Sequence, residues 1–159
     1  MAIPPVSFKT RASLLDRLID MAPREKRELR PLRTMERPDI RAAVARDLRW
    51  LLNTRTPLSA GEFDARELTV IDYGVPDFGM GTPASFRDQK QRASRTEKAI
   101  RAFEPRLQDV RVSIAPKMDS ERSLQMTIEA VMVADDVREP VSFMTIYDSE
   151  TGTLEINAD

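Results

Sequence analysis

The stretch from Ala102 to Val112, AFEPRLQDVRV, constrains the fold more than any other part of the chain. A helix-like spacing of apolar residues gives way there to a strand-like alternation. Pro105 has no amide hydrogen and pushes the residue before it out of helical geometry. We therefore predict that a helix ends at about Phe103 and that a sheet begins at Leu107.

Two long helices are predicted before this stretch. The first covers residues 38–53, with Pro38 in its first turn and Asp39 near the positive end of its dipole. One apolar stripe runs along it, made by Ile40, Val44, Leu48, Leu51 and Leu52. Trp50 lies off the centre of the stripe, so we expect it at the edge of the core, with contact to a partner as the alternative.

The second long helix is predicted over residues 83–103, opened by Thr82 and Pro83. Its apolar stripe is narrow, because mostly charged residues separate Phe86, Ala93, Ile100 and Phe103. We expect solvent over most of its surface, and packing in a bundle with partner proteins is the alternative.

Shorter elements are predicted as well. Residues 13–20, SLLDRLID, fit a short helix capped by Ser13, whose apolar side chains must dock on another element. Residues 22–38 contain three prolines and are expected to form a linker or an extended arm. Val70 and Ile71 fit a single helical turn, with Gly74 as its left-handed ending.

From Leu107 onward, apolar residues alternate with polar ones, and this pattern predicts strands at 109–116, 123–134, 141–147 and 152–157, with a turn at Asp148 to Gly152. The predicted fold is α+β: N-terminal helices followed by a four-stranded antiparallel β-meander, with the helices packed on one face. We divide the chain into an N-terminal arm with a short helix (1–37) and a domain (38–159) with helices 38–53 and 83–103 and a sheet over 107–157.

The composition excludes several kinds of chemistry. The chain has no cysteine and no histidine, which rules out disulfides, metal sites built from thiolate or imidazole ligands, and catalytic triads with an imidazole base. We expect no cofactor and no metal. No apolar run is long enough to span a bilayer, and the N-terminus lacks the pattern of a secretory signal, so a cytoplasmic location is expected. Residues 107–159 hold 4 Lys or Arg and 11 Asp or Glu, out of 25 and 26 in the chain, so the predicted sheet is acidic and the first part of the chain basic.

Glu104 and Arg106 are the charged residues whose position is most constrained. Unless a bulge intervenes, they share the strand face of Val110 and Val112, with Leu107 out of phase. An acid and a base that face a core must pair, either with each other or with a partner chain. As an enzyme, the chain would use Glu104 as a general acid, as in lysozyme-like peptidoglycan hydrolysis. That reaction needs a second carboxylate across a cleft, and Asp109 lies on the opposite strand face.

Three other patterns are weaker. GMGTP, residues 79–83, lacks the lysine of a phosphate loop and is read as a turn. Asp72 and Asp77 in DYGVPD suit a capped loop better than a cation site. The arginines are interleaved with acids and form no recognisable nucleic-acid module.

Three motifs in this order resemble the TssE family, baseplate subunits of bacterial type VI secretion systems: RDLRWLLNTRTP (46–57), VIDYGVPDF (70–78) and IRAFEPRLQDVRV (100–112). The family is similar to the wedge protein of contractile phage tails and is often labelled lysozyme-like. Glu104, Pro105 and Arg106 match its Glu-Pro-Arg signature.

The resemblance implies an assembly role without catalysis. Members of the family sit in the baseplate wedge with TssF, TssG and TssK, docked at the inner membrane complex, and the region around Glu104, Pro105 and Arg106 would join the core bundle of the wedge. The sheet would act as a template on which the sheath proteins TssB and TssC begin to polymerise by strand exchange. The rival hypotheses are a peptidoglycan hydrolase that uses Glu104 and a small adaptor unrelated to contractile machines.

Overall fold

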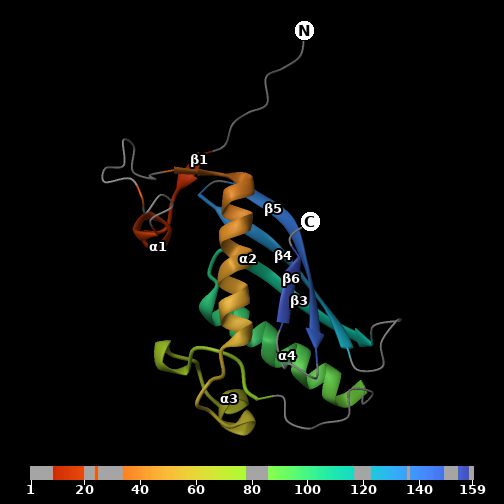
Figure 1. Cartoon of the computed structure of the whole chain (residues 1–159). Coiled ribbons are helices and arrows are strands. Elements are labelled where there is room, and N and C mark those ends of the chain that lie inside the picture. Colours follow the sequence, from red (N-terminus) through yellow and green to blue (C-terminus); the bar gives the residue numbers. More distant parts are fainter. Residues whose placement is uncertain are drawn as a thin grey trace.

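The computed structural model describes residues 9–19, 24, 34–77, 86–116, 123–135, 137–148 and 154–157. Figure 1 shows a long helix standing beside a twisted sheet, with a second helix along the sheet's lower side. Helices precede the strands of the main sheet, which are antiparallel, so the predicted α+β class is confirmed. Among the described residues, no helix has the length and apolarity needed to cross a membrane.

Helix α2 (Arg37–Asn53) supplies one side of the core. Its first turn is closed by a capping box between Glu36 and Asp39, with Pro38 where its missing amide hydrogen costs nothing. The predicted apolar stripe is buried, together with one further alanine: Ile40, Ala43, Val44, Leu48, Leu51 and Leu52. Trp50 is 48% exposed, so it lies at the surface.

Helix α4 (Phe86–Phe103) differs from the prediction. It buries a face that includes five polar or small residues, and it packs against the following strand instead of being solvated over most of its surface. The buried residues are Gln89, Arg92, Ala93, Thr96, Ala99 and Ile100. Phe86, which was expected on the apolar stripe, is exposed. The start predicted at Thr82 and Pro83 lies outside the described residues, as does the GMGTP turn.

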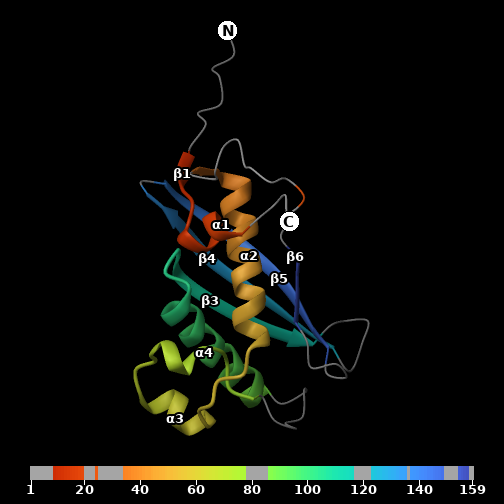
Figure 2. The same cartoon turned by 60° about the vertical axis from the view of Figure 1, so that its left-hand side comes forward.

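The main sheet contains β3 (Leu107–Pro116), β4 (Ser123–Ala134), β5 (Val137–Asp148) and β6 (Leu154–Asn157), in that spatial order. Val112, Ile128 and Phe143 are cross-strand neighbours on the buried face. Figures 1 and 2 show α2 and α4 against this sheet, and Ile100, Leu48 and Phe143 belong to one core cluster. The alternation of buried and exposed residues follows the pleat of each strand.

A second sheet was not predicted. β1 (Lys9–Arg11) pairs antiparallel with β2 (Thr34–Glu36), so the strands form two antiparallel sheets and not the single meander expected. β2 falls within the predicted linker or arm. The short helix α1 (Leu14–Leu18) follows β1 and is capped by Ser13 as predicted, since the Ser13 side chain accepts from the Asp16 amide.

The orientation of α1 contradicts the prediction that its apolar residues dock. Leu14 and Leu18 are 70% and 73% exposed, whereas Asp16 is buried. An ion pair described below turns the helix this way. α1 therefore exposes leucines at the surface and is bound to the rest of the domain through the carboxylate of Asp16.

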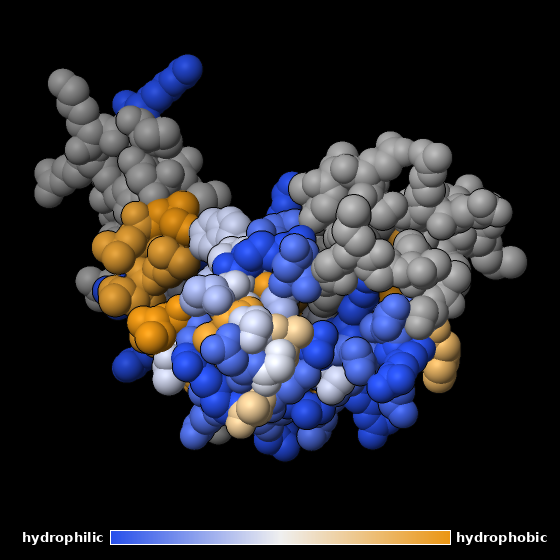
Figure 3. Space-filling view, turned by 90° about the horizontal axis from the view of Figure 1, so that it is seen from below, coloured by the Kyte–Doolittle hydropathy of each residue, from blue (hydrophilic) through white to orange (hydrophobic). Residues whose placement is uncertain are grey.

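Two further elements lie between α2 and α4. α3 (Ala60–Ala65), which the sequence reading missed, carries a capping box between Ser59 and Glu62 and buries Phe63. The 3-10 helix η1 (Val70–Asp72) is the predicted single turn. In the face seen from below in Figure 3, the coloured residues are mostly hydrophilic, with hydrophobic side chains gathered at one side. Val70 and Ile71 are among the exposed apolar residues of the chain.

Gly74 has a left-handed φ of 117°, as predicted for the ending of this turn. The chain there runs beside the end of α2: the Thr56 amide donates to Val75 O over 3.1 Å and the Val75 amide donates to Thr54 O over 2.9 Å. A Cβ on Gly74 would lie 2.6 Å from Thr54 O, a backbone atom that cannot move away easily.

Gly74→Ala is therefore expected to lower the free energy of unfolding by about 2 kcal/mol, from backbone strain and the clash together. Gly61→Ala is the matched control, because Gly61 lies in helix α3 and nothing is within 4 Å of the added carbon. That variant should be neutral or stabilised by up to about 1 kcal/mol. Urea unfolding of both proteins checks this, and equal stabilities would refute it.

Candidate interaction site at the corner between α4 and β3

The corner between α4 and β3 is built from backbone bonds around Pro105. The Glu104 amide still donates to Ile100 O over 2.8 Å, and the Leu107 amide donates back to Glu104 O over 3.0 Å. The helix ends at Phe103 as predicted. Because proline donates no hydrogen bond, the chain turns at Pro105 without leaving a buried amide unpaired.

A bulge follows the corner and changes which residues face the core. Gln108 pairs with Val131 and Arg111 with Glu129, so two residues lie opposite one, and Asp109 takes a left-handed φ of 52°. Leu107 and Val110 are consequently both buried. Glu104, Arg106 and Val110 were expected to share a face only if no bulge intervened, and this bulge interrupts the strand where the misfit of Leu107 indicated it.

Glu104 and Arg106 bind each other within the chain. Arg106 Nε donates to Glu104 Oε1 over 2.7 Å, and Arg106 Nη2 donates to Glu104 Oε2 over 2.5 Å. Glu104 is only 4% exposed. Such two-pronged contacts between guanidinium and carboxylate are stronger and more directional than single hydrogen bonds.

Asp47, on α2, completes the pairing of Arg106. Arg106 Nη2 also donates to Asp47 Oδ2 over 2.5 Å. The Arg106 carbonyl accepts from the Val133 amide over 2.8 Å, which ties the same residue to β4. Arg106 therefore joins the end of α4, the middle of α2 and the main sheet.

The charge cluster continues to the N-terminal arm. Arg46 donates to Asp47 Oδ1 over 2.9 Å through Nε and to Asp16 Oδ1 over 2.7 Å through Nη2. Ser13 Oγ donates to the other oxygen of Asp16 over 2.6 Å. We call the five charged residues Glu104, Arg106, Asp47, Arg46 and Asp16 the corner network.

Contacts within the corner network shift the pKa values of two of its members, Arg106 and Asp16. Burial lowers the pKa of Arg106, but the hydrogen bonds and charges of Glu104 and Asp47 outweigh that effect and raise its pKa overall. For Asp16, burial raises the pKa, and the Ser13 and Arg46 hydrogen bonds and the positive charges of Arg46 and Arg106 lower it further than burial raises it. The pKa of the Tyr73 hydroxyl is raised by burial and by the charges of Asp47 and Glu104, so Tyr73 lies close to the network.

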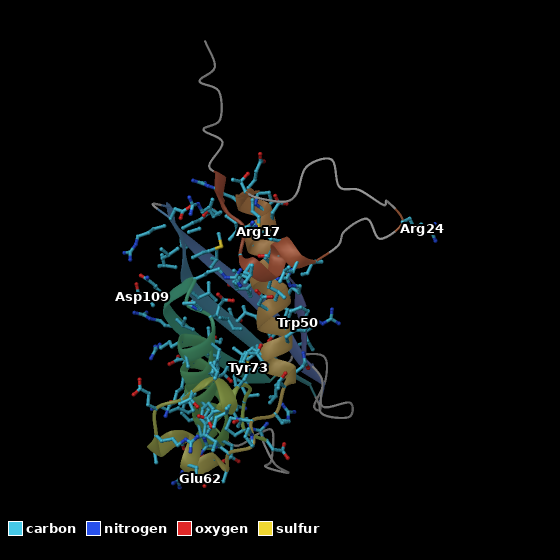
Figure 4. The ribbon with its side chains drawn as sticks, turned by 90° about the vertical axis from the view of Figure 1, so that its left-hand side faces the viewer. Arg17, Arg24, Trp50, Glu62, Tyr73 and Asp109 are labelled. Carbon is cyan, nitrogen blue, oxygen red and sulfur yellow. The ribbon has the colours of Figure 1, made fainter. Side chains whose placement is uncertain are left out.

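Exposed apolar side chains lie beside residues of the corner network. Leu14, Leu15 and Leu18 are exposed on α1. Arg46 stacks over the Trp50 ring at 5.2 Å, and Tyr73 contacts Phe103 edge to face at 5.2 Å between ring centroids. Figure 4 shows Arg17 of α1, Trp50 and Tyr73 along the same side of the molecule. We call the surface made by Leu14, Leu15, Leu18, Trp50 and Tyr73 the corner face.

Sequence reasoning found two of the five network residues, Glu104 and Arg106. It missed Asp47, Arg46 and Asp16, which come from other elements. The available signal was an Arg-Asp pair beside the apolar stripe of α2, within the motif RDLRWLLN. Asp47 and Arg106 lie 59 positions apart, so no local pattern in the sequence reveals that they pair.

Of the other candidates, GMGTP lies outside the described residues and the DYGVPD loop is described. Asp72 accepts from the Thr69 amide over 2.9 Å and pairs with Arg66, so the capped-loop reading is confirmed. Among the described residues, no group of three or more His, Cys, Asp or Glu is arranged to hold a metal ion. A cleft of about 210 Å³ beside the corner is lined by Arg106, Asp16 and Asp135 among others, and Glu104 is not part of its lining.

The corner lies inside a segment with a recognisable family. Residues 38–137 match the family model described as baseplate wedge protein gp25. These residues include α2, the corner, β3 and β4, and they are more than half of the chain. The chain belongs to this family of baseplate wedge proteins.

Two further comparisons are weaker. No curated protein matches the chain. A crystal structure of a Geobacter sulfurreducens protein, provisionally described as a tail lysozyme, is 19% identical, with a TM-score of 0.47, and the match covers 66% of this chain and 88% of that one. This likeness is too distant to bear on activity.

Asp16 makes stability depend on pH. Its pKa is lowered by folding, so its contribution is present above the pKa of the unfolded chain, about 3.9, and is lost as pH falls through the lower folded value. At pH 7, Asp16→Asn should lower the free energy of unfolding by about 1.5–3 kcal/mol, and this difference should shrink below about pH 4.

Chemical unfolding at pH 7 and pH 3 measures the effect. Glu67→Gln is the control, because Glu67 is exposed. A difference for Asp16→Asn that stays constant between the two pH values would contradict the role given to this carboxylate.

Proposed function

We propose that the chain is a structural subunit of a type VI secretion baseplate that links the wedge to the contractile sheath and initiates sheath polymerisation by strand augmentation. The observation that carries the proposal is the match of residues 38–137 to the baseplate wedge family. The Glu-Pro-Arg corner within that segment supports it, since the corner network joins α1, α2 and β3 into one unit.

The wedge contact is assigned to the corner. The partners are TssF, TssG and TssK, and the interaction residues are Glu104, Pro105 and Arg106. Because Glu104 and Arg106 already bind each other, and Arg106 also binds Asp47, they serve the contact by holding the corner face in place. Exposed leucines beside a tryptophan are typical of a surface that packs against another protein.

The sheath contact is assigned to the main sheet. A sheet whose outermost strand has a neighbour on one side only presents unpaired N–H and C=O groups, and an extended segment of another chain satisfies them. TssB and TssC are the proposed sheath partners. The subunit acts in the cytoplasm, in a baseplate docked at the inner membrane complex.

The lysozyme-like alternative has little physical support at Glu104. A general acid must present a proton to the substrate, but both oxygens of Glu104 accept from Arg106. The nearest second carboxylate of the network, Asp47, binds the same guanidinium. We therefore propose that the chain is no enzyme. Cleavage of peptidoglycan by the purified protein would contradict this.

The wedge contact is tested with Trp50→Ala combined with Leu18→Ser. Both side chains are exposed, so the free energy of unfolding should change by less than about 1 kcal/mol. Co-purification with TssF and TssG should fall about tenfold or more, and sheath assembly in cells should fall with it.

Phe86→Ser is the matched control. Phe86 is 79% exposed and lies at the first residue of α4, at the end of the helix away from the corner, and its replacement should leave co-purification unchanged. Normal recovery of the wedge proteins with the Trp50 and Leu18 variant would reject the corner face as the contact.

A further inference from the structure

The main sheet ends in two outermost strands, β3 and β6, and the structure treats them differently. In an antiparallel sheet, the N–H and C=O of every second residue point to the same edge. Each outermost strand therefore offers such groups to solvent or to another chain unless something else binds them.

Side chains of α4 already bind the outward groups of β3. The Val112 amide donates to Glu97 Oε1 over 2.9 Å, and Arg101 Nη2 donates to Val110 O over 2.7 Å. Glu97 and Arg101 are themselves paired at 3.5 Å, one helical turn apart. This pair supplies one acceptor and one donor at the spacing of a neighbouring strand, and α4 lies along β3 (Figure 1).

The part of β5 that extends beyond β6 is also obstructed. β6 pairs only with Met144 to Tyr147 of β5. In the preceding part, Pro140 has no amide hydrogen, and Arg41 Nη2 of α2 donates to Ser142 O over 3.2 Å. Prolines and bound carbonyls are ways to keep a strand edge from pairing.

Among the described residues, no hydrogen bond occupies the outer edge of β6, so this edge is the one left for a partner strand. The Ser142 carbonyl points away from β4. The N–H and C=O of Met144, two residues on, point the same way, toward its partner Asn157 in β6. Ile156, next to Asn157, must then direct its N–H and C=O to the open side of the sheet. The Ile156 side chain packs toward the core cluster, which leaves its backbone as the feature presented at this edge.

The charge near β6 indicates what kind of strand fits there. From Asp148 to Asp159, the stretch of sequence that contains β6, the chain has no Lys or Arg and four acids: Asp148, Glu150, Glu155 and Asp159. A second copy of this chain would bring the same acids to the contact and be repelled, whereas a strand with lysine or arginine is attracted.

We propose that a partner joins the main sheet at the outer edge of β6, as an extended segment that carries Lys or Arg, and that Glu97 and Arg101 close the β3 edge to it. This inference rests on the proposed strand augmentation and adds the edge and the chemistry of the partner.

The test uses two heptapeptide probes, Lys-Val-Thr-Val-Lys-Val-Thr and the same peptide with Glu for Lys, added to the purified full chain labelled with ¹⁵N. Amide signals of Leu154 to Asn157 should shift with the lysine peptide, and the glutamate peptide should bind about five- to tenfold more weakly at low salt. Shifts confined to Val112 and Ile114, equal affinities, or no shift at millimolar peptide would each overturn the inference.

A matched pair of variants tests the closure of β3. Glu97→Leu with Arg101→Leu removes both side-chain hydrogen bonds, so peptide-induced shifts should now also occur at Val112. Glu97→Gln retains the Oε1 acceptor and should keep the edge closed. Unchanged behaviour of the leucine variant would show that these two side chains do not close the edge.

Cells separate this inference from the proposed function. A photo-crosslinking residue at position 155 of β6 should capture a sheath protein, and one at exposed position 111 of β3 should not. Capture from position 111 alone would move the contact to β3 and leave strand augmentation standing. Capture from neither position, while sheaths assemble normally, would remove both proposals.

Discussion

The ion pairs made by the guanidinium of Arg106 are the interactions on which the rest of the structure depends. The guanidinium binds Glu104 at the end of α4 and Asp47 in the middle of α2. The backbone carbonyl of Arg106 accepts from the Val133 amide at the start of the β3–β4 ladder. Glu104 is buried, whereas the side chains of Arg106 and Asp47 are 25% and 21% exposed, so removing one member leaves the others without a partner at a cost below the roughly 3–5 kcal/mol of a fully buried pair. The corner is therefore a tertiary contact first, and its surface properties follow from it.

This arrangement explains why a motif that resembles a catalytic carboxylate with a helper can belong to a baseplate wedge family. Glu104 is held by the residue two positions away, and that residue is held by a second helix. Arg46 binds both Asp47 and Asp16, and the ion pair with Asp16 fixes α1 with its leucines outward. One network of charges thus sets the relative positions of the sheet, two helices and the corner face.

The sequence predicted the regular elements well and the tertiary contacts poorly. The apolar stripe of α2 and the strand alternation after Leu107 are periodic signals, because each records which face of a single element is buried. The bulge at Asp109 needed the partner strand, although the misfit of Leu107 pointed to it. The outward leucines of α1 could not be foreseen, since an ion pair to Arg46, 30 positions away, outweighs the apolar pattern of five residues. The buried face of α4, with its polar residues, could not be foreseen either, because it depends on packing against β3, which is a tertiary contact.

A double-mutant cycle between Asp47 and Arg106 tests the central claim most directly. Urea unfolding of Asp47→Asn, Arg106→Met and the double variant should give a coupling free energy of about 1.5–3 kcal/mol, because each residue loses the same contact. The pair of Asp64 and Arg95, joined at 2.8 Å with Asp64 50% exposed, is the reference and should couple by about 0.2–1 kcal/mol. If the effects at Asp47 and Arg106 add to within about 0.3 kcal/mol, the corner is not locked by this contact and the account is wrong.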